Sequence, residues 1–210
     1  MPRDEFGDLI ARGYDRVADE YAALESETEP WPRLARLRAF VADLPDGSRV
    51  LDLGCGNGVP ATREIASRHV VTGVDISPEQ IARAEVNVPG TTFHCADVRV
   101  IEFAPRSFDA IVALYLIDNV PSQDYPALFR KIAGWLEPGG RILLSAEPGR
   151  DPGQVYEWLG VPMFINTIPA PELAAMLEAA SLHVVEMDTE SQKEGGREIE
   201  FVWLIAEASR

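Results

Sequence analysis

The 210-residue sequence has little cysteine, and nowhere a long hydrophobic run. Its two cysteines, Cys55 and Cys95, stand far apart and form no C-x-x-C pair, which argues against a disulfide framework and a thiolate zinc site. No stretch approaches the roughly 18 apolar residues of a membrane-spanning helix. The first residues lack the apolar core of a signal peptide. We therefore expect a cytoplasmic protein that uses no metal.

Basic charge is also scarce, because 19 lysines and arginines face 34 aspartates and glutamates and leave a formal net charge of −15. Such a surface repels phosphate backbones and anionic lipids, so nucleic acids and membranes are not expected as partners. The three histidines, His69, His94 and His183, form no cluster with carboxylates at metal-ligand spacing. A small-molecule partner is the expectation that remains, and the oligomeric state stays unknown.

The order of elements predicts an α/β fold. Apolar residues recur at steps of three and four within residues 4–24 and 32–44, which indicates two amphipathic helices separated by a break at 25–30. After residue 48, short apolar runs alternate with helical stretches, as in a parallel sheet covered by helices. Strands are expected at 49–53, 70–74, 92–95, 108–113, 141–145, 181–187 and 198–206, and helices at 61–67, 78–86, 125–136 and 171–180. The polar segment 188–197 is expected to connect the last two strands as a hairpin.

The segment VLDLGCGNGV, residues 50–59, carries the clearest functional signal. Three glycines at alternate positions follow a buried strand and precede a helix, so the chain can turn sharply and a ligand can approach its backbone. The dinucleotide motif G-x-G-x-x-G would need glycine where this sequence has Val59. The carboxylate of Asp52, just before the loop, would repel a pyrophosphate and attract an ammonium group. The loop therefore favours a cofactor with a cationic amino-acid end, such as S-adenosylmethionine, over NAD.

A second carboxylate, Asp75, ends the next predicted strand, where it can accept hydrogen bonds from both ribose hydroxyls of a cofactor. NAD-binding proteins share this feature. Ile76 can pack on the adenine, and Asp97, after the third strand, can accept from the adenine amino group. Other interpretations stay open, because Asp75 also fits a helix cap together with Ser77, and Asp97 also fits a turn.

Five segments, taken in order, resemble those of class I S-adenosylmethionine-dependent methyltransferases: VLDLGCGNGVP, VVTGVDIS, FHCADV, FDAIVALYLIDNVP and WLEPGGRILLS. The later segments EWLGVPMF and FVWLIAEA look like small-molecule methyltransferases of bacterial secondary metabolism. The resemblance implies a Rossmann-like, doubly wound, seven-stranded sheet in the order 3-2-1-4-5-7-6, with strand 7 antiparallel. Residues 1–44 are expected as an N-terminal helical cap and 45–210 as the cofactor-binding core of a single structural domain.

The resemblance also implies the reaction, transfer of a methyl group from S-adenosylmethionine to oxygen, nitrogen or carbon of a small organic acceptor. It places the N-terminal helix over the cofactor, with a tyrosine near the methionine part. Cofactor contacts are expected at Tyr14, Tyr21, Asp52, Gly54, Cys55, Gly56, Asp75, Ile76, Asp97, Val98, Leu114 and Tyr115.

The acceptor is expected beyond the carboxyl ends of the fourth and fifth strands. Related enzymes often carry histidine where this chain has Asn119, which leaves Asp118, or a water held by Asn119, as the catalytic groups. Asp118 equally fits a helix cap. The glycine- and proline-rich stretch 147–164 is long enough for a lid. Acceptor-binding residues are expected at Tyr14, Tyr115, Asn119, Trp158, Met163 and Phe164, although these aromatic residues also fit core packing.

Two other functions are compatible with the sequence. An NAD-dependent oxidoreductase can share the fold, but Asp52 and Val59 argue against it. A non-catalytic S-adenosylmethionine-binding protein is conceivable because the expected histidine is missing.

Overall fold

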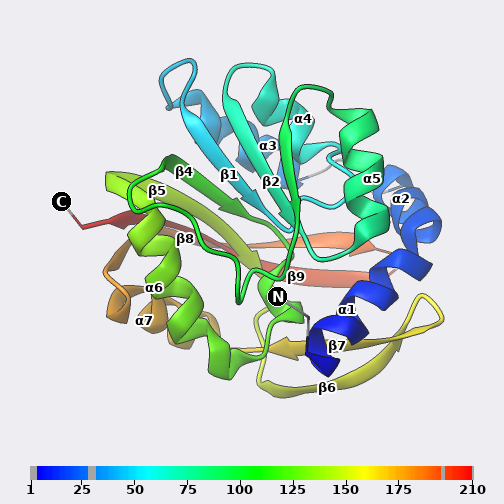
Figure 1. The fold of residues 1–210 in the computed structure, drawn as a ribbon. Helices are drawn as coiled ribbons and strands as arrows, with labels where there is room; N and C mark the ends of the chain where they lie inside the picture. Colours follow the sequence, from blue (N-terminus) through cyan, green and yellow to red (C-terminus); the bar gives the residue numbers. More distant parts are fainter. Residues whose placement is uncertain (1–3, 28–31, 195–196, 210) are drawn as a thin grey trace.

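The computed structural model describes residues 4–27, 32–194 and 197–209. Its main sheet contains β1 (Arg49–Leu53), β2 (Val70–Asp75), β3 (Thr92–Cys95), β4 (Phe108–Ala113), β5 (Leu136–Ala146), β8 (Leu182–Glu194) and β9 (Arg197–Ala208). The seven strands lie in the order β3-β2-β1-β4-β5-β9-β8 (Figure 1). β1 to β5 run parallel, and β9 pairs antiparallel with both β5 and β8. The predicted sheet order is confirmed, with β8 and β9 as the predicted sixth and seventh strands.

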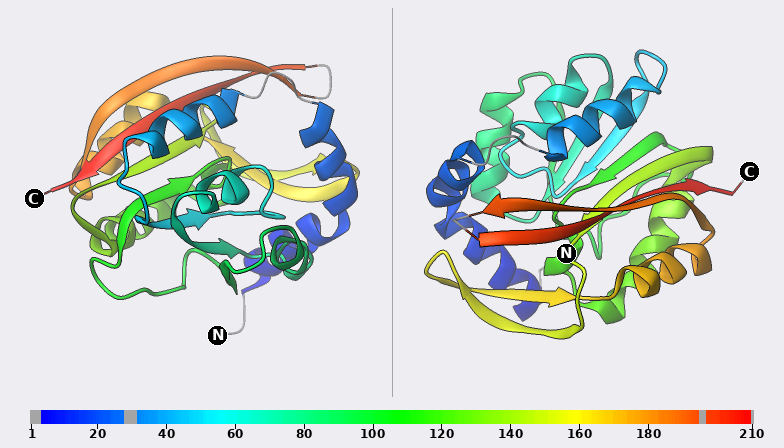
Figure 2. Two further views of the ribbon diagram at one scale, coloured as in Figure 1. Left: turned by 90° about the horizontal axis from the view of Figure 1, so that it is seen from above. Right: turned by 180° about the vertical axis from the view of Figure 1, so that it is seen from behind.

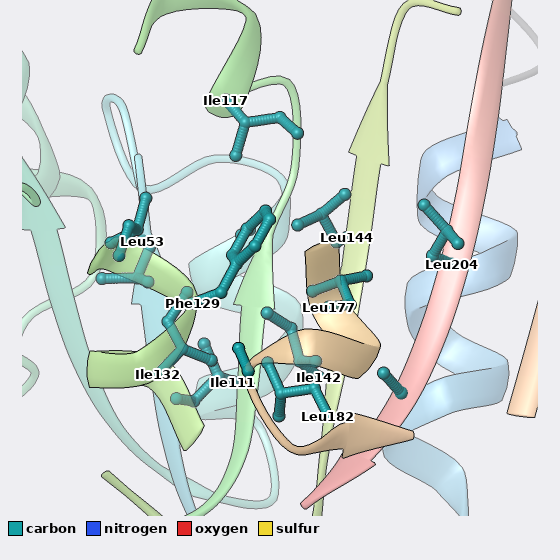
Figure 3. Close-up of a cluster of buried hydrophobic side chains, with 14 of the residues drawn as sticks. Leu53, Ile111, Ile117, Phe129, Ile132, Ile142, Leu144, Leu177, Leu182 and Leu204 are labelled. Carbon is teal, nitrogen blue, oxygen red and sulfur yellow. The ribbon is translucent and has the colours of Figure 1, made fainter. Parts of the chain in front are cut away.

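Helices cover both faces of this sheet. Successive side chains of a strand point to opposite faces, and both faces are apolar here, so each face needs a covering layer. The helices are α3 (Pro32–Ala42), α4 (Ala61–Ala66), α5 (Pro78–Asn87), α6 (Tyr125–Trp135) and α7 (Ala170–Ala179). In β1, Leu51 and Leu53 join the core under α6 and α7, part of which is drawn in Figure 3. Val50 joins the core under α3 and α4 on the other side. Burial on both faces explains why the strands read as continuous apolar runs.

Two N-terminal helices and a hairpin lie together outside the main sheet (Figure 2). They are α1 (Glu5–Arg16), α2 (Ala18–Glu27), β6 (Asp151–Trp158) and β7 (Val161–Thr167). Two short 3-10 helices, η1 (Ile117–Asn119) and η2 (Ser122–Asp124), come after β4 in the chain. α1 packs on β7 so closely that a Cβ on Gly13 would lie 2.6 Å from Cε of Met163. Glycine at this position therefore permits the contact between helix and hairpin.

Several element predictions were wrong. The single helix expected at 4–24 is two helices, and α2 continues into the expected break, whose remaining residues 28–30 lie outside the described ranges. No strand was expected between 146 and 170, where 147–164 was interpreted as a lid, yet residues 151–158 and 161–167 form the β6–β7 hairpin. Residues 188–194, expected as a connector, are strand, because they pair with β9 from Asp188 opposite Trp203 onward. Arg36 of α3 binds Asp188 and Glu190, so this acidic stretch is stabilised by charge as well as by the ladder.

The proposed boundary between cap and core, at residue 44, stays a prediction. α3 lies before that boundary and packs its Leu37, Phe40 and Val41 against the sheet. Within the described ranges, no helix has the length and apolar character needed to cross a membrane.

Candidate functional site

A large cavity opens at the carboxyl ends of β1, β2 and β4, beneath α1 and α2. It encloses about 940 Å³ of empty space, part of it open to solvent. All the residues predicted to bind the cofactor line it: Tyr14, Tyr21, Asp52, Gly54, Cys55, Gly56, Asp75, Ile76, Asp97, Val98, Leu114 and Tyr115. The tertiary structure thus brings together groups that are spread over the first 115 residues. Their contacts with a cofactor stay predictions.

The glycine loop has the backbone conformation that its sequence predicts. Gly54 and Gly56 have φ values of +73° and +52°, a backbone region that residues other than glycine rarely adopt. The amides of Gly54 and Cys55 both donate to the carbonyl of Val74, at 2.8 and 3.0 Å, which fixes the loop against β2. A Cβ on Gly56 would meet no atom within 4 Å. At Gly56 the loop backbone therefore faces open space in the cavity.

Asp75 connects this loop to the next helix. Its Oδ2 accepts from the amide of Gly56 and its Oδ1 from the amide of Ser77, both at 2.9 Å. Ser77 is the residue that caps α5, accepting from the amide of Gln80 at 3.0 Å. Burial raises the pKa of Asp75 to about 6. Each carboxylate oxygen accepts more than one hydrogen bond, so Asp75 can still receive hydroxyl donors from a ligand.

Asp52 lies on the same rim of the cavity, at the end of β1. It is buried, and its Oδ2 accepts from Oγ1 of Thr62 at 2.6 Å. Burial raises the pKa of Asp52 to about 6, an effect to which the neighbouring negative charge of Asp75 adds. Arg33 of α3 opposes this shift, and its guanidinium lies 4.7 Å from the ring centroid of Tyr115. The sequence did not single out Arg33 because α3 carries three arginines in one amphipathic pattern.

Asp97 has a strong protein partner. Both of its carboxylate oxygens accept from the side chain of Arg99, at distances from 2.6 to 3.1 Å. Arg99 also donates to Asp4, the N-cap of α1, at 2.7 Å and lies over the ring of Phe6. The pair therefore fastens α1 to the loop after β3. Its geometry agrees with the turn interpretation as much as with an adenine contact, which stays a prediction.

Gln80 is a cavity residue that the sequence analysis missed, since a single glutamine in a helix follows no distinctive pattern. It is 2 % exposed and lines the large cavity. Neither its Oε1 nor its Nε2 has a hydrogen-bond partner among the described residues. A buried amide without partners costs free energy that a ligand with a donor and an acceptor would recover. Together with Asp52, Asp75 and the open glycine loop, Gln80 fits a nucleoside with a cationic tail.

A second cavity adjoins the first, and the two share Tyr14, Tyr21, Tyr115 and Asn119. Its full lining is Tyr14, Tyr21, Tyr115, Asp118, Asn119, Glu147, Trp158, Met163, Ile165 and Phe201. These include both predicted catalytic residues and all the predicted acceptor-binding residues except Phe164. Phe164 instead packs edge-on against Phe6, with ring centroids 4.9 Å apart. In the described ranges, no group of three or more His, Cys, Asp and Glu side chains is placed to hold a metal ion.

The side-chain amide of Asn119 holds the site together. Its Oδ1 accepts from the hydroxyl of Tyr14 at 2.7 Å, and its Nδ2 donates to the carbonyl of Phe164 at 2.8 Å. Asn119 thus joins η1 to α1 and to β7. Both ends of the amide thus have a protein partner, which indicates a positioning role for Asn119, and the water that it was expected to hold stays a prediction.

Asp118 is buried beside Glu147, whose amide lies 3.2 and 3.3 Å from its two carboxylate oxygens. Burial raises the pKa of Asp118 well above its usual range, and the negative charge of Glu147 adds a smaller effect in the same direction. A carboxyl group that keeps its proton cannot act as a base. The base role predicted for Asp118 therefore needs a pH above this raised pKa.

The buried carboxyl groups predict how stability changes with pH. The raised pKa values of Asp52, Asp75 and Asp118 mean that the folded state binds protons more tightly than the unfolded state. Their contribution to the free energy of unfolding is fully present below pH 3.8, the ordinary pKa of an aspartate. For Asp52 and Asp75 this contribution is lost as the pH rises to about 6, and for Asp118 it is lost at higher pH. Carboxylates with a lowered pKa, such as Asp4 and Asp109, lose their contribution below about pH 4.

We expect the free energy of unfolding in urea to be highest near pH 4 and about 5 kcal/mol lower at pH 8. The Asp118→Asn variant should show a smaller decrease over the same range. A profile that is flat or rises towards pH 8 would contradict this prediction.

Comparisons with known proteins identify the family of this chain. Residues 26–187 match the model of a methyltransferase domain family. The chain is 35% identical over 147 residues to 27-O-demethylrifamycin SV methyltransferase of Amycolatopsis mediterranei, covering 67% of this chain and 52% of the relative. It is 29% identical over 129 residues to a ubiquinone biosynthesis O-methyltransferase of Coxiella burnetii, covering 59% and 53%. The chain thus spans about half the length of each of these relatives.

Solved structures agree on the fold. A Burkholderia thailandensis 1,6-didemethyltoxoflavin-N1-methyltransferase, solved with bound 1,6-didemethyltoxoflavin and S-adenosylhomocysteine, superimposes with a TM-score of 0.76. The match covers 100% of this chain and 93% of that one. At 21% sequence identity it shows that the two chains share a fold and nothing further. The family model covers most of the chain and confirms the resemblance that the sequence motifs predict. The chain therefore belongs to the methyltransferase domain family.

Proposed function

We propose that this chain binds S-adenosylmethionine in the large cavity and transfers its methyl group to a small organic acceptor held in the adjoining cavity. The observation that carries this proposal is the wall the two cavities share, formed by Tyr14, Tyr21, Tyr115 and Asn119. A methyl donor in one cavity and a methyl acceptor in the other would both contact these four residues and so lie close together. Proximity and alignment are the main contributions a protein makes to a reaction of this kind.

The residues of the large cavity have distinct roles in this proposal. The cofactor, when bound, supplies a methyl group already activated on a sulfonium. Asp75 receives the ribose hydroxyls, and Gln80 recovers hydrogen bonds for its buried amide. Asp52 and Arg33, of opposite charge, would hold the amino-acid end, while α1 and the β6–β7 hairpin exclude water from the site.

The setting of the reaction is part of the same proposal. The name of the rifamycin relative supports a role in secondary metabolism. The acidic composition supports a small-molecule partner, with neither nucleic acid nor membrane involved, and a cytoplasmic location.

Calorimetry followed by a methylation assay tests the proposal. We expect S-adenosylhomocysteine to bind and NADH not to bind. With labelled S-adenosylmethionine and a panel of phenols, amines and β-dicarbonyl compounds, label should appear in at least one product. Binding of NADH alone would indicate an oxidoreductase. Binding of S-adenosylhomocysteine without turnover on any acceptor would indicate a non-catalytic binding protein.

A Gln80→Leu variant separates a ligand-binding role from a structural one. Leucine has a similar size and no unsatisfied polar atoms, so we expect the free energy of unfolding to rise by about 1 kcal/mol. The affinity for S-adenosylhomocysteine should fall about tenfold, because the ligand loses its partner amide. Gln154→Leu, an exposed change on β6, is the control and should leave the affinity unchanged. Unchanged cofactor affinity in Gln80→Leu would contradict the assigned role.

A further inference from the structure

Tyr115, which comes just after β4 in the chain, has an unusual backbone conformation. Its φ angle of +53° lies in the left-handed region, which costs free energy for a residue that carries a side chain. Its amide donates to Oγ of the completely buried Ser145 at 2.9 Å, and this bond helps to hold the conformation. Strained residues persist only where the surrounding structure fixes them, and they are frequent at functional sites. Tyr115 agrees with that rule, because it lines both cavities.

The side chain of Tyr115 is held as firmly as its backbone. Phe201 and Trp203 of β9 meet its ring almost at right angles, with centroids 4.6 and 5.9 Å away. The guanidinium of Arg33 lies 4.7 Å from the centroid of the same ring. At the far end of the ring, the hydroxyl donates to Oε1 of Gln192 at 3.0 Å. This hydrogen bond is directional, so it fixes the tilt of the ring in a way that apolar contacts do not.

Gln192 comes from the part of the β8–β9 hairpin that extends beyond β5. Residues 197–201 of β9 pair with β8 and not with β5. Among residues 185–193, Gln192 has the one buried side chain, 6 % exposed. It lines neither of the two cavities. A polar group is buried at a cost unless it is hydrogen-bonded, and the hydroxyl of Tyr115 gives this amide a partner.

We propose that Gln192 is a positioning residue of the methyltransferase site. Through the hydroxyl of Tyr115, it holds a ring that would lie against the bound cofactor in one cavity and the acceptor in the other. This inference rests on the proposed function and adds to it a residue that contacts neither ligand. It also gives the polar extension of the β8–β9 hairpin a role in the site.

A double-mutant cycle on cofactor affinity tests this role. Tyr115→Phe removes the hydroxyl and keeps the ring, and Gln192→Met removes the amide and keeps the length of the side chain. Calorimetry with S-adenosylhomocysteine compares the unaltered chain, both single variants and the double variant. We expect each single variant to bind about fivefold more weakly, because the ring is no longer held. The double variant should bind within about twofold of either single variant, because both changes remove the same hydrogen bond.

Gln154→Met on β6 is the matched control. The amide of Gln154 also binds a tyrosine hydroxyl, that of Tyr156 at 2.7 Å, but both residues are exposed and line neither cavity. This variant should bind S-adenosylhomocysteine as the unaltered chain does. Thermal unfolding shows whether each variant is folded, and Gln192→Leu replaces Gln192→Met in the cycle if the methionine variant does not fold. Tyr115→Phe removes a single oxygen atom, and unchanged affinity in this variant would by itself overturn the inference.

The remaining outcomes separate this inference from the proposed function. Three results would overturn the inference while S-adenosylhomocysteine binding leaves the proposed function standing. They are an unchanged affinity in Gln192→Met, losses that multiply in the double variant, and an equal loss in Gln154→Met. An unaltered chain that does not bind S-adenosylhomocysteine would overturn the proposed function, and the role of Gln192 with it.

Discussion

An Asp75→Asn variant is expected to bind S-adenosylhomocysteine at least a hundredfold more weakly than the unaltered chain. The carboxylate ends β2, lines the large cavity and is oriented by the amides of Gly56 and Ser77. Hydrogen bonds to a charged group contribute about 1.5–3 kcal/mol each. Asparagine keeps one acceptor oxygen but carries no charge, so it loses one ribose hydrogen bond and weakens the other. A hundredfold loss corresponds to about 2.7 kcal/mol, and calorimetry measures it directly.

The matched control is Glu79→Gln, which removes an exposed carboxylate four residues away on α5. Glu79 pairs with Arg83 at 2.8 Å and does not line the cavity, so its loss should leave the affinity unchanged. In Asp75→Asn, the amide nitrogen would face the N–H of Gly56 or Ser77, so thermal unfolding of the variant is measured alongside its affinity. An Asp75→Asn affinity within threefold of the unaltered chain would rule out the ribose assignment.

The second large effect is expected on stability, from Asn166→Leu in β7. Asn166 is completely buried, and its Nδ2 donates to the carbonyls of Asp118 and Val120 at 2.8 and 2.9 Å. Leucine fills a similar volume but leaves both carbonyls without this donor, and each such loss costs about 1–3 kcal/mol. We expect the free energy of unfolding in urea to fall by about 3 kcal/mol. For a chain of this length, the melting temperature should fall by about 10 °C.

Tyr125→Phe gives a graded comparison in the same network. The hydroxyl of Tyr125 donates to the carbonyl of Ile117 at 2.7 Å, so its removal takes one main hydrogen bond away from the same turn. A loss of about 1 kcal/mol is expected. If Asn166→Leu were no more destabilising than Tyr125→Phe, Asn166 would not be the main support of η1.

The residues that sequence patterns predicted as cofactor contacts all line one cavity. Asp52 and Asp75 lie at the carboxyl ends of β1 and β2, Asp97 follows β3, and the carboxyl ends of parallel strands meet at one edge of a sheet. Recognising the strands was therefore enough to bring these carboxylates together. The same patterns did not find Gln80 or Arg33, because their significance lies in what surrounds them and not in their spacing.

The acceptor side was harder to derive. Tyr14 and Asn119 are hydrogen-bonded although 105 residues separate them, and neither lies in a motif that predicts the contact. Glu147 belongs to the stretch expected as a lid, yet only its position beside Asp118 gives it a role in the acceptor cavity. Contacts between distant elements depend on how α1 and the hairpin pack on the sheet.

By itself, the sequence determined the doubly wound sheet and its glycine loop, because apolar runs and glycine spacing act on neighbouring residues and leave a local pattern. Only the tertiary structure decided that residues 188–194 form a strand, that β6 and β7 pair, and that Asp97 binds Arg99. In the two strand cases, polar or glycine-rich segments gain their conformation from hydrogen-bonded partners in other strands. Pairing energy of that kind depends on long-range contacts that no local pattern records.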